Sequence, residues 1–241
     1  MVAARQTLPY TSLAAVVPCA SGWLVLPGRL QGVTVAIESP FGLPQLIDVL
    51  DHRPAFDAIA LGAPIGFPRD PVDGERGCER EVRELIGWPR RTSIPAVPGH
   101  AALHARSADE AHELEEWVTP LAHRTFDRWR EIDVEFQPFH QRSIYSTHPE
   151  LTFHLLNGER PLASSPHTIE GQDERLALAA AKLPGIERMI ADARVRGAHR
   201  RHLVDAAGLL WTARRIVGRV VNRYPDEPEW NEIGMRMEYV R

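Results

Sequence analysis

Glu150 and His148 occupy a sequence context that could support chemistry. A proline separates them, and a proline is favoured in the first turn of a helix, so His148 is expected to begin a short helix. That helix follows a strand, which places both residues at an end of the sheet, where binding and catalytic residues concentrate. Both are therefore candidate catalytic residues, and Glu150 is also a candidate metal ligand. The alternative is that Glu150 only stabilises the helix N-terminus through the helix dipole.

Asp205 is the other candidate, both as a catalytic residue and as a metal ligand. It lies beside the apolar face that Ala206 and Ala207 contribute to a long predicted helix. Burying an unpaired charge is costly, so a carboxylate at this boundary requires a partner. An arginine is the more frequent partner, and a metal ion is the alternative.

The eleven histidines are scattered singly, apart from His199 and His202. These two lie three residues apart, and such a pair fits either a metal site or a solvated helix face. The chain has no P-loop, no G-x-G-x-x-G after a strand, no G-x-S-x-G elbow and no H-E-x-x-H. It therefore lacks the usual phosphate-binding and serine-nucleophile signatures.

The elements that must position these residues follow from hydrophobic periodicity and turn signals. Strands are expected over 13–17, 23–26, 31–37, 58–61, 143–146 and 236–240. Helices are expected over 43–50, 78–86, 107–133 (one or two), 148–156, 173–182, 186–194 and 200–224, with Ser107 and Glu110 forming a capping box. We predict one α/β domain over 1–241, with a polar loop at 69–77 and an irregular Pro/Arg-rich arm around 87–105.

Charge and composition limit the possible partners. The net charge of the 241 residues is −4, which does not indicate nucleic-acid binding by the whole molecule. Segment 194–223, however, carries eight arginines and one acid, Asp205, so it could contact nucleic acid; the alternative is a solvated helix face. Two cysteines build no disulfide framework, and no 18-residue apolar run occurs. We expect a soluble, cytoplasmic protein that does not contact a membrane.

Seven collinear segments carry a family resemblance that runs from about residue 14 to the C-terminus. They are CASGW (19–23), IALGAPIGFP (59–68), GERGCEREVRELIG (74–87), STHPELTFHLLNG (146–158), TIEGQDERL (168–176), HLVDAAGLLWTA (202–213) and EIGMRMEYV (232–240). In these segments the chain resembles domain-of-unknown-function family 429, described as predicted nucleases with an RNase-H fold. The resemblance implies an RNase-H-like mixed β-sheet flanked by α-helices.

Most acidic positions that the family pattern implies are not acidic in this chain. They read Val17, Gly62, Ser146, Arg201 and His202, and Asp205 alone remains. Glu150, Glu79 and Arg175 do match the pattern. A second registration, through residues 37–44, would supply Glu38 in place of Gly62.

The missing acids decide which mechanism is expected. In this family, carboxylates are implied to hold two Mg²⁺ ions that activate water and stabilise the leaving oxygen. Loss of a single charge-stabilising group already lowers a rate about 10²–10³-fold. The leading hypothesis is therefore a catalytically impaired protein, without a cofactor, that binds a nucleic acid, a nucleotide or a protein partner.

Two enzyme hypotheses remain beside it. One is a metal-dependent phosphodiesterase that uses Glu38, Glu150 and Asp205 around one Mg²⁺ or Mn²⁺. The other is different chemistry with His148 or His202 as the base. The resemblance also implies a geometric expectation, namely that Val17, Gly62 and Asp205 lie together although they are far apart in the sequence.

Overall fold

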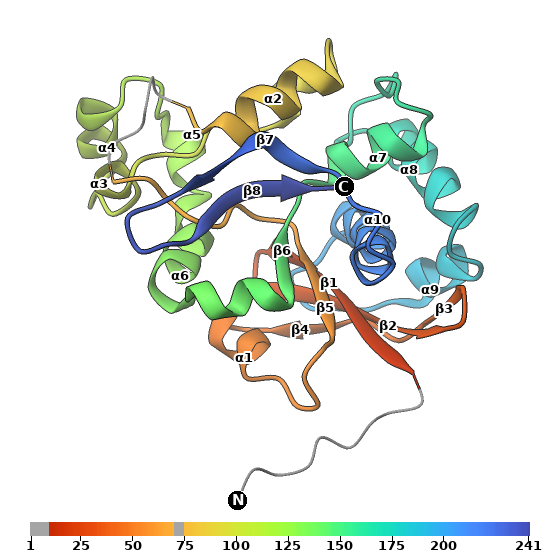
Figure 1. Ribbon diagram of the computed structural model, residues 1–241. Coiled ribbons are helices and arrows are strands. Elements are labelled where there is room, and N and C mark those ends of the chain that lie inside the picture. Colours follow the sequence, from red (N-terminus) through yellow and green to blue (C-terminus); the bar gives the residue numbers. More distant parts are fainter. Residues whose placement is uncertain (1–9, 70–74) are drawn as a thin grey trace, which may run out of the picture.

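The computed structural model describes residues 10–69 and 75–241. Its centre is a six-stranded mixed sheet in the order β3-β2-β1-β5-β6, with β4 paired to β2 (Figure 1). β1 runs antiparallel to β2 and parallel to β5, and β5 runs parallel to β6. The strands are β1 (Thr11–Cys19), β2 (Gly22–Gln31), β3 (Thr34–Ile37), β4 (Phe41–Leu43), β5 (Ala58–Leu61) and β6 (Ile144–Ser146).

Helices cover both faces of this sheet, and a separate antiparallel pair of strands lies above it (Figure 1). That pair is β7 (Arg223–Trp230) and β8 (Arg236–Val240). The helices are α1 (Leu46–Leu50), α2 (Gly77–Ile86), η2 (Arg90–Ser93), α3 (His100–Leu103), α4 (Ala108–Leu114), α5 (Pro120–His123), α6 (Phe126–Glu135), η3 (Pro138–Arg142), α7 (Pro149–Leu156), α8 (Ile169–Ala180), α9 (Ile186–Asp192) and α10 (Arg200–Val217). The predicted mixed α/β architecture is confirmed, and it is compatible with an RNase-H-like fold.

Strand β1 is buried on both faces, which explains its almost continuous apolar sequence. Successive side chains of a strand point to opposite faces. Leu13 and Ala15 pack into the hydrophobic cluster that contains α10, while Ala14 and Val16 pack into the cluster that contains α1 and α6. β1 therefore contributes side chains to the hydrophobic clusters on both faces of the sheet, between the two layers of helices.

Helix α10 lies over β1, β2 and β5 and also contacts α7 and α8. Its middle approaches α7 closely at Gly208. A Cβ at this position would lie 2.8 Å from Cζ of Phe153, a fully buried residue of α7. Because Gly208 has no side chain, α10 can pack this closely against Phe153 of α7.

The long helix ends seven residues earlier than the predicted boundary at 224. Arg219 adopts a left-handed conformation (φ 55°). Its N–H donates to the Ile216 carbonyl (3.0 Å), and the Val220 N–H donates to the Arg215 carbonyl (3.1 Å), as in a Schellman motif. The nearby glycine, Gly218, lies one position before the left-handed residue, so the sequence did not mark this helix end. Residues 223–230 instead form strand β7, which was not predicted.

Other boundaries also differ from the sequence-based expectation. β2 continues to Gln31, five residues beyond its predicted end, and α8 begins at Ile169, four residues before its predicted start. Residues 41–43 form β4, so the helix predicted over 43–50 is limited to α1. The stretch 107–133 holds three helices rather than one or two. The loop predicted over 69–77 lies partly outside the described residues, and α2 begins at Gly77.

The predicted capping box at Ser107 is only half formed. Oγ of Ser107 accepts a hydrogen bond from the Glu110 N–H (3.1 Å). The Glu110 carboxylate accepts from the N–H of Arg106 (2.8 Å), one residue before the cap. No helix within 10–69 and 75–241 is both long enough and apolar enough to cross a membrane.

The close contact at Gly208 predicts the sign of a stability change. In an exposed helix, Gly→Ala stabilises by about 1 kcal/mol. Here the added methyl group meets the buried Phe153 ring, so Gly208→Ala should destabilise the protein by about 1–2 kcal/mol in urea unfolding. Gly218→Ala is the matched control, because its Cβ would have only ordinary contacts at 3.5 Å. Equal stabilisation by both variants would contradict the contact.

Candidate functional site

A cavity of about 710 Å³ opens where the parallel strands β1 and β5 end. Its wall includes the end of β1, the turn after β5, η2, the first turns of α6, α7 and α10, and the segment before α8. The carboxyl ends of parallel strands are a common place for ligand sites in α/β proteins. Of the sequence candidates, His148, Glu150, Arg201, His202 and Asp205 line this cavity.

Val17, Gly62 and Asp205 all line the same cavity, so their predicted convergence is confirmed. The Gly62 N–H donates to the Val16 carbonyl (2.7 Å), which places the end of β5 beside the end of β1. A Cβ at Gly62 would lie 3.0 Å from Cγ1 of Val17 and 2.8 Å from Cδ1 of Leu209, one turn after Asp205. A larger residue at position 62 would therefore require Leu209 to move.

The registration that supplies Glu38 is contradicted by the structure. Glu38 follows β3, an edge strand separated from β1 by β2, and its carboxylate forms an ion pair with Arg29. It lines a different depression, together with Arg188. Two strand spacings of about 5 Å separate β3 from β1, so position 62, not 38, lies beside Val17.

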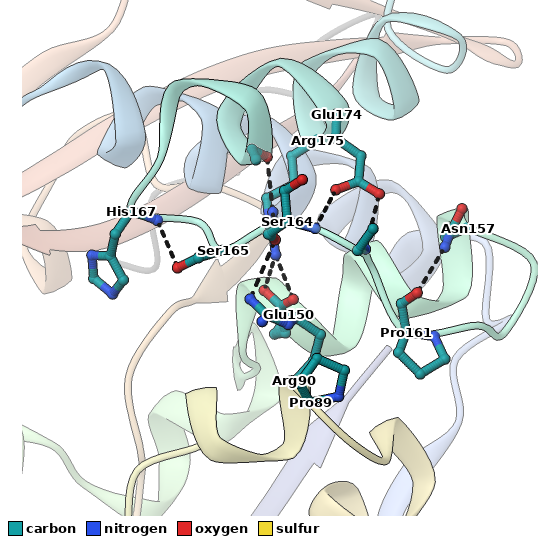
Figure 2. A network of polar contacts seen from close by, with 12 residues as sticks. Pro89, Arg90, Glu150, Asn157, Pro161, Ser164, Ser165, His167, Glu174 and Arg175 are labelled. Carbon is teal, nitrogen blue, oxygen red and sulfur yellow. Dashed lines mark hydrogen bonds and ion pairs between the residues drawn. The ribbon is translucent and has the colours of Figure 1, made fainter.

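Glu150 forms a buried ion pair with Arg175 of α8 (Figure 2). The two residues are 2% and 1% exposed. Nη2 of Arg175 donates to both carboxylate oxygens, at 2.5 and 2.8 Å, and Nη1 donates to the carbonyls of Ser164 and Gly171. Burial raises the pKa of Glu150, and Arg175 opposes that shift. Because Arg175 holds both oxygens, a metal ion at Glu150 would have to displace it.

His148, rather than Glu150, caps the N-terminus of α7. Its Nδ1 accepts a hydrogen bond from the Glu150 N–H (3.2 Å), which assigns the ring proton of the neutral imidazole to Nε2. Burial lowers the pKa of His148 to about 4, so the ring is neutral at pH 7. His148 can therefore offer one N–H donor to the cavity but does not carry a positive charge there.

Ser146 has a structural contact instead of a charge. Its hydroxyl donates to the Ala63 carbonyl (2.7 Å), and the residue is 2% exposed. This bond ties the end of β6 to the turn after β5. Ser146, a position at which the resemblance implies an acid, thus links β6 to the turn after β5, beside the cavity.

Asp205 lines the cavity and, in the described part of the chain, is not paired with an arginine; an Asp205 that faces solvent in the cleft is the alternative expected when positions 17 and 62 carry no charge. It is half-buried, and no hydrogen bond or ion pair reaches its carboxylate among the residues that the structure describes. Burial is the main cause that raises the pKa of Asp205, to about 7. Three nearby charges have smaller effects: Arg201 and Arg175 lower this pKa, and Glu150 raises it. Burial thus favours the protonated, neutral form of Asp205, because an unpaired buried charge is costly.

The first turn of α10 adds an arginine beside two neutral histidines. Nη1 of Arg201 lies 2.7 Å from Nδ1 of His167, and Nη2 lies 3.4 Å from Nε2 of His202. His202 also accepts the His199 N–H through Nδ1 (2.9 Å). Burial, then Arg201 and His199, lower the pKa of His202 to about 4. The hydrogen bond between His199 and His202 thus satisfies a backbone N–H at the start of α10.

Arg90 is a cavity residue that the sequence interpretation missed. It lies on η2, within the arm predicted around 87–105, and its Nη1 donates to the Ser164 carbonyl (3.2 Å). Its buried Nε has no hydrogen-bond partner among the residues that the structure describes. The only sequence signal for Arg90 was the high arginine content of the arm, which does not show that this residue lines the cavity. Arg128, also at the cavity, differs because it is ion-paired with Glu131.

Several of the other arginines of 194–223 have partners within the protein. Arg200 pairs with Asp173, Arg223 pairs with Glu238, and Arg215 donates to the Val220 carbonyl. Arg200 and Arg215 lie at opposite ends of α10, about 20 Å apart at 1.5 Å per residue. Contact between this segment and a nucleic acid stays a prediction.

The fold and the cavity define an α/β protein with a ligand-sized site at the ends of its central parallel strands. Residues 18–230 match the model of the family described as "Protein of unknown function (DUF429)". The chain belongs to that family. Comparison with curated proteins and with solved structures found no match.

The raised pKa of Asp205 predicts a pH-dependent stability difference. Its folded-state pKa (about 7) exceeds the ordinary value of 3.8, so the stability that protonation contributes is present below pH 3.8 and is lost as pH rises through about 7. Asp205→Asn cannot ionise. Its advantage over the native protein should grow between about pH 4 and 7 and then level off. About three pKa units correspond to about 4 kcal/mol, and solvent screening of the half-buried carboxylate should reduce this to the order of 2 kcal/mol.

Urea unfolding of both proteins at several pH values measures this difference. Asp226→Asn, at an exposed position, is the matched control and should show no such trend. A stability difference between Asp205→Asn and the native protein that stays constant from pH 4 to 8 would show that Asp205 is an ordinary surface carboxylate.

Proposed function

We propose that the protein binds a phosphate-bearing ligand, a nucleotide or the phosphodiester of a nucleic acid, in this cavity without two-metal hydrolysis. The supporting observation is the cavity's charge. Arg90 and Arg201 line it, and in the described part of the chain neither is paired with a carboxylate. The only carboxylate there that is free of an arginine is Asp205, which is half-protonated near pH 7.

The chemistry of guanidinium groups favours this ligand class. Arginine donates paired N–H groups whose spacing matches phosphate oxygens, and it stays charged at all physiological pH values. The first turn of α10 contributes Arg201, and the positive end of that helix's dipole favours an anion at the same place. A volume of about 710 Å³ lies within the range of nucleotide-sized pockets, whereas a protein partner would need a broad surface.

Two-metal hydrolysis is not supported by the residues present. Neither Val17 nor Gly62 offers a side-chain atom that could bind a metal ion, and the Ser146 hydroxyl donates its hydrogen bond to the Ala63 carbonyl. Glu150 is held by Arg175, and Glu38 lies elsewhere. Asp205 alone would have to position the ions, whereas Mg²⁺ sites usually combine one or two carboxylates with substrate phosphates. The rival one-metal phosphodiesterase loses two of its three acids for the same reasons.

Binding of a dinucleotide with a single phosphodiester tests the proposal, because the charge of that ligand is constant over neutral pH. Arg201→Ala and Arg90→Ala should each weaken binding about 10–100-fold in calorimetric titration, as expected for a lost charge-assisted hydrogen bond. Arg201→Lys should retain part of the affinity. Arg106→Ala, at a side chain that is 93% exposed and away from the cavity, should have no effect.

Equal affinity in all four variants would place the ligand elsewhere. Failure of the native protein to bind any phosphate-bearing ligand at low salt would overturn the proposal and favour a protein partner.

Metal-dependent cleavage should be absent. With Mg²⁺ or Mn²⁺, purified protein should leave single- and double-stranded DNA, RNA and DNA–RNA hybrids intact, because three of the implied acids are replaced by Val17, Gly62 and Ser146. Denaturing gel electrophoresis of labelled substrates is the measurement. Cleavage that disappears in Asp205→Ala would instead establish the one-metal phosphodiesterase.

A further inference from the structure

A second group of polar side chains lies outside the cavity, between α3 and α6. His100 begins α3 and His104 follows its last residue, so the two imidazoles lie four positions apart on one face. Their ring centroids are 4.6 Å apart. Asp133 of α6 faces both, with Oδ2 2.9 Å from Nδ1 of His100 and 2.7 Å from Nε2 of His104. The sequence interpretation that His100 and His104 are isolated histidines was therefore wrong.

The three ligand atoms lie close enough to share one metal ion. They are all within 4.8 Å of one another, and within 10–69 and 75–241 no other group of three His, Cys, Asp or Glu residues does so. Zinc–nitrogen and zinc–oxygen bonds of about 2.0–2.2 Å place tetrahedral ligands roughly 3.3–3.5 Å apart. Only small rotations of the two exposed histidines would be needed, and Asp133, with a side chain 9% exposed, is held in place.

The backbone beneath the group is fixed by hydrogen bonds. Arg130, one turn before Asp133 on α6, donates through Nε to the Leu103 carbonyl (2.6 Å) and through Nη2 to the Ala105 carbonyl (3.1 Å). The N–H of His100 donates to the Pro68 carbonyl (2.8 Å). These contacts anchor both ends of α3 and keep the two histidines opposite the carboxylate before any ion binds.

We infer that His100, His104 and Asp133 form a binding site for a divalent transition-metal ion, with Zn²⁺ as the best fit. Imidazole nitrogen selects zinc, copper or nickel over Mg²⁺ and Ca²⁺, which prefer oxygen ligands. Three protein ligands leave the fourth position of a tetrahedral ion to water, as the exposure of His100 (56%) and His104 (33%) allows. The ion would join α3 to α6, whose Trp129 lines the cavity one turn before Asp133.

Calorimetric titration of tag-free, chelator-treated protein with Zn²⁺ tests the site. The native protein should bind one ion per chain. Substitutions of the outer partners of metal ligands already weaken binding about 10–100-fold. His100→Gln, His104→Gln and Asp133→Asn should therefore each weaken binding at least tenfold. Loading with Co²⁺ should give the visible absorption of a tetrahedral ion in the native protein and not in the variants.

His199→Ala is the matched control, because it removes a histidine from the other closely spaced pair. It should bind Zn²⁺ like the native protein. The side chains of His100 and His104 are exposed, whereas that of Asp133 is largely buried, so circular dichroism checks that each variant, Asp133→Asn above all, is folded. No zinc binding by the native protein, binding that survives in the three ligand variants, or binding lost in His199→Ala would each overturn the inference.

Discussion

The buried ion pair between Glu150 and Arg175 holds together the elements that enclose the cavity. It joins α7 to α8, and the same guanidinium holds the Ser164 carbonyl, which Arg90 of η2 also binds (Figure 2). Each of these two buried charges is compensated by the other. Removing one partner of such a pair leaves an unpaired buried charge and typically destabilises a protein by about 3–5 kcal/mol. Segments far apart in the sequence are thus linked through Arg175, which binds the Glu150 carboxylate and shares the Ser164 carbonyl with Arg90, and the shape of the cavity depends on these contacts.

The same pair also fixes the cavity's electrical character. Because Arg175 holds Glu150, and because Val17 and Gly62 carry no charge, Asp205 is the acid lining the cavity that no arginine of the described residues holds. Arg90 and Arg201 also line the cavity, and within 10–69 and 75–241 neither is paired with a carboxylate. Neutral His148 and His202, whose pKa values burial lowers to about 4, add donors and acceptors without changing the charge.

The sequence predicted the fold better than the site. Apolar runs located β5 and β8 to the residue and the buried centres of β1 and β2, because buried strands are encoded locally, although β2 continues five residues beyond its predicted end. It missed β7, whose prolines and acids are unlike a typical strand, and the end of α10, where the left-handed residue is an arginine. The convergence of Val17, Gly62 and Asp205 came from the family resemblance. Arg90 and the His100–His104–Asp133 group could not be found, since only tertiary packing brings them to their partners.

The contact between position 62 and Leu209 links the rim of the cavity to the hydrophobic core. A side chain at 62 would meet Cγ1 of Val17 at 3.0 Å and Cδ1 of Leu209 at 2.8 Å. The methyl group of Leu209 is the far end of a flexible side chain, so it could rotate away, but Leu209 is fully buried and its neighbours in the core would have to accommodate the new rotamer. A change of residue at the cavity would therefore be transmitted into the packing beneath α10.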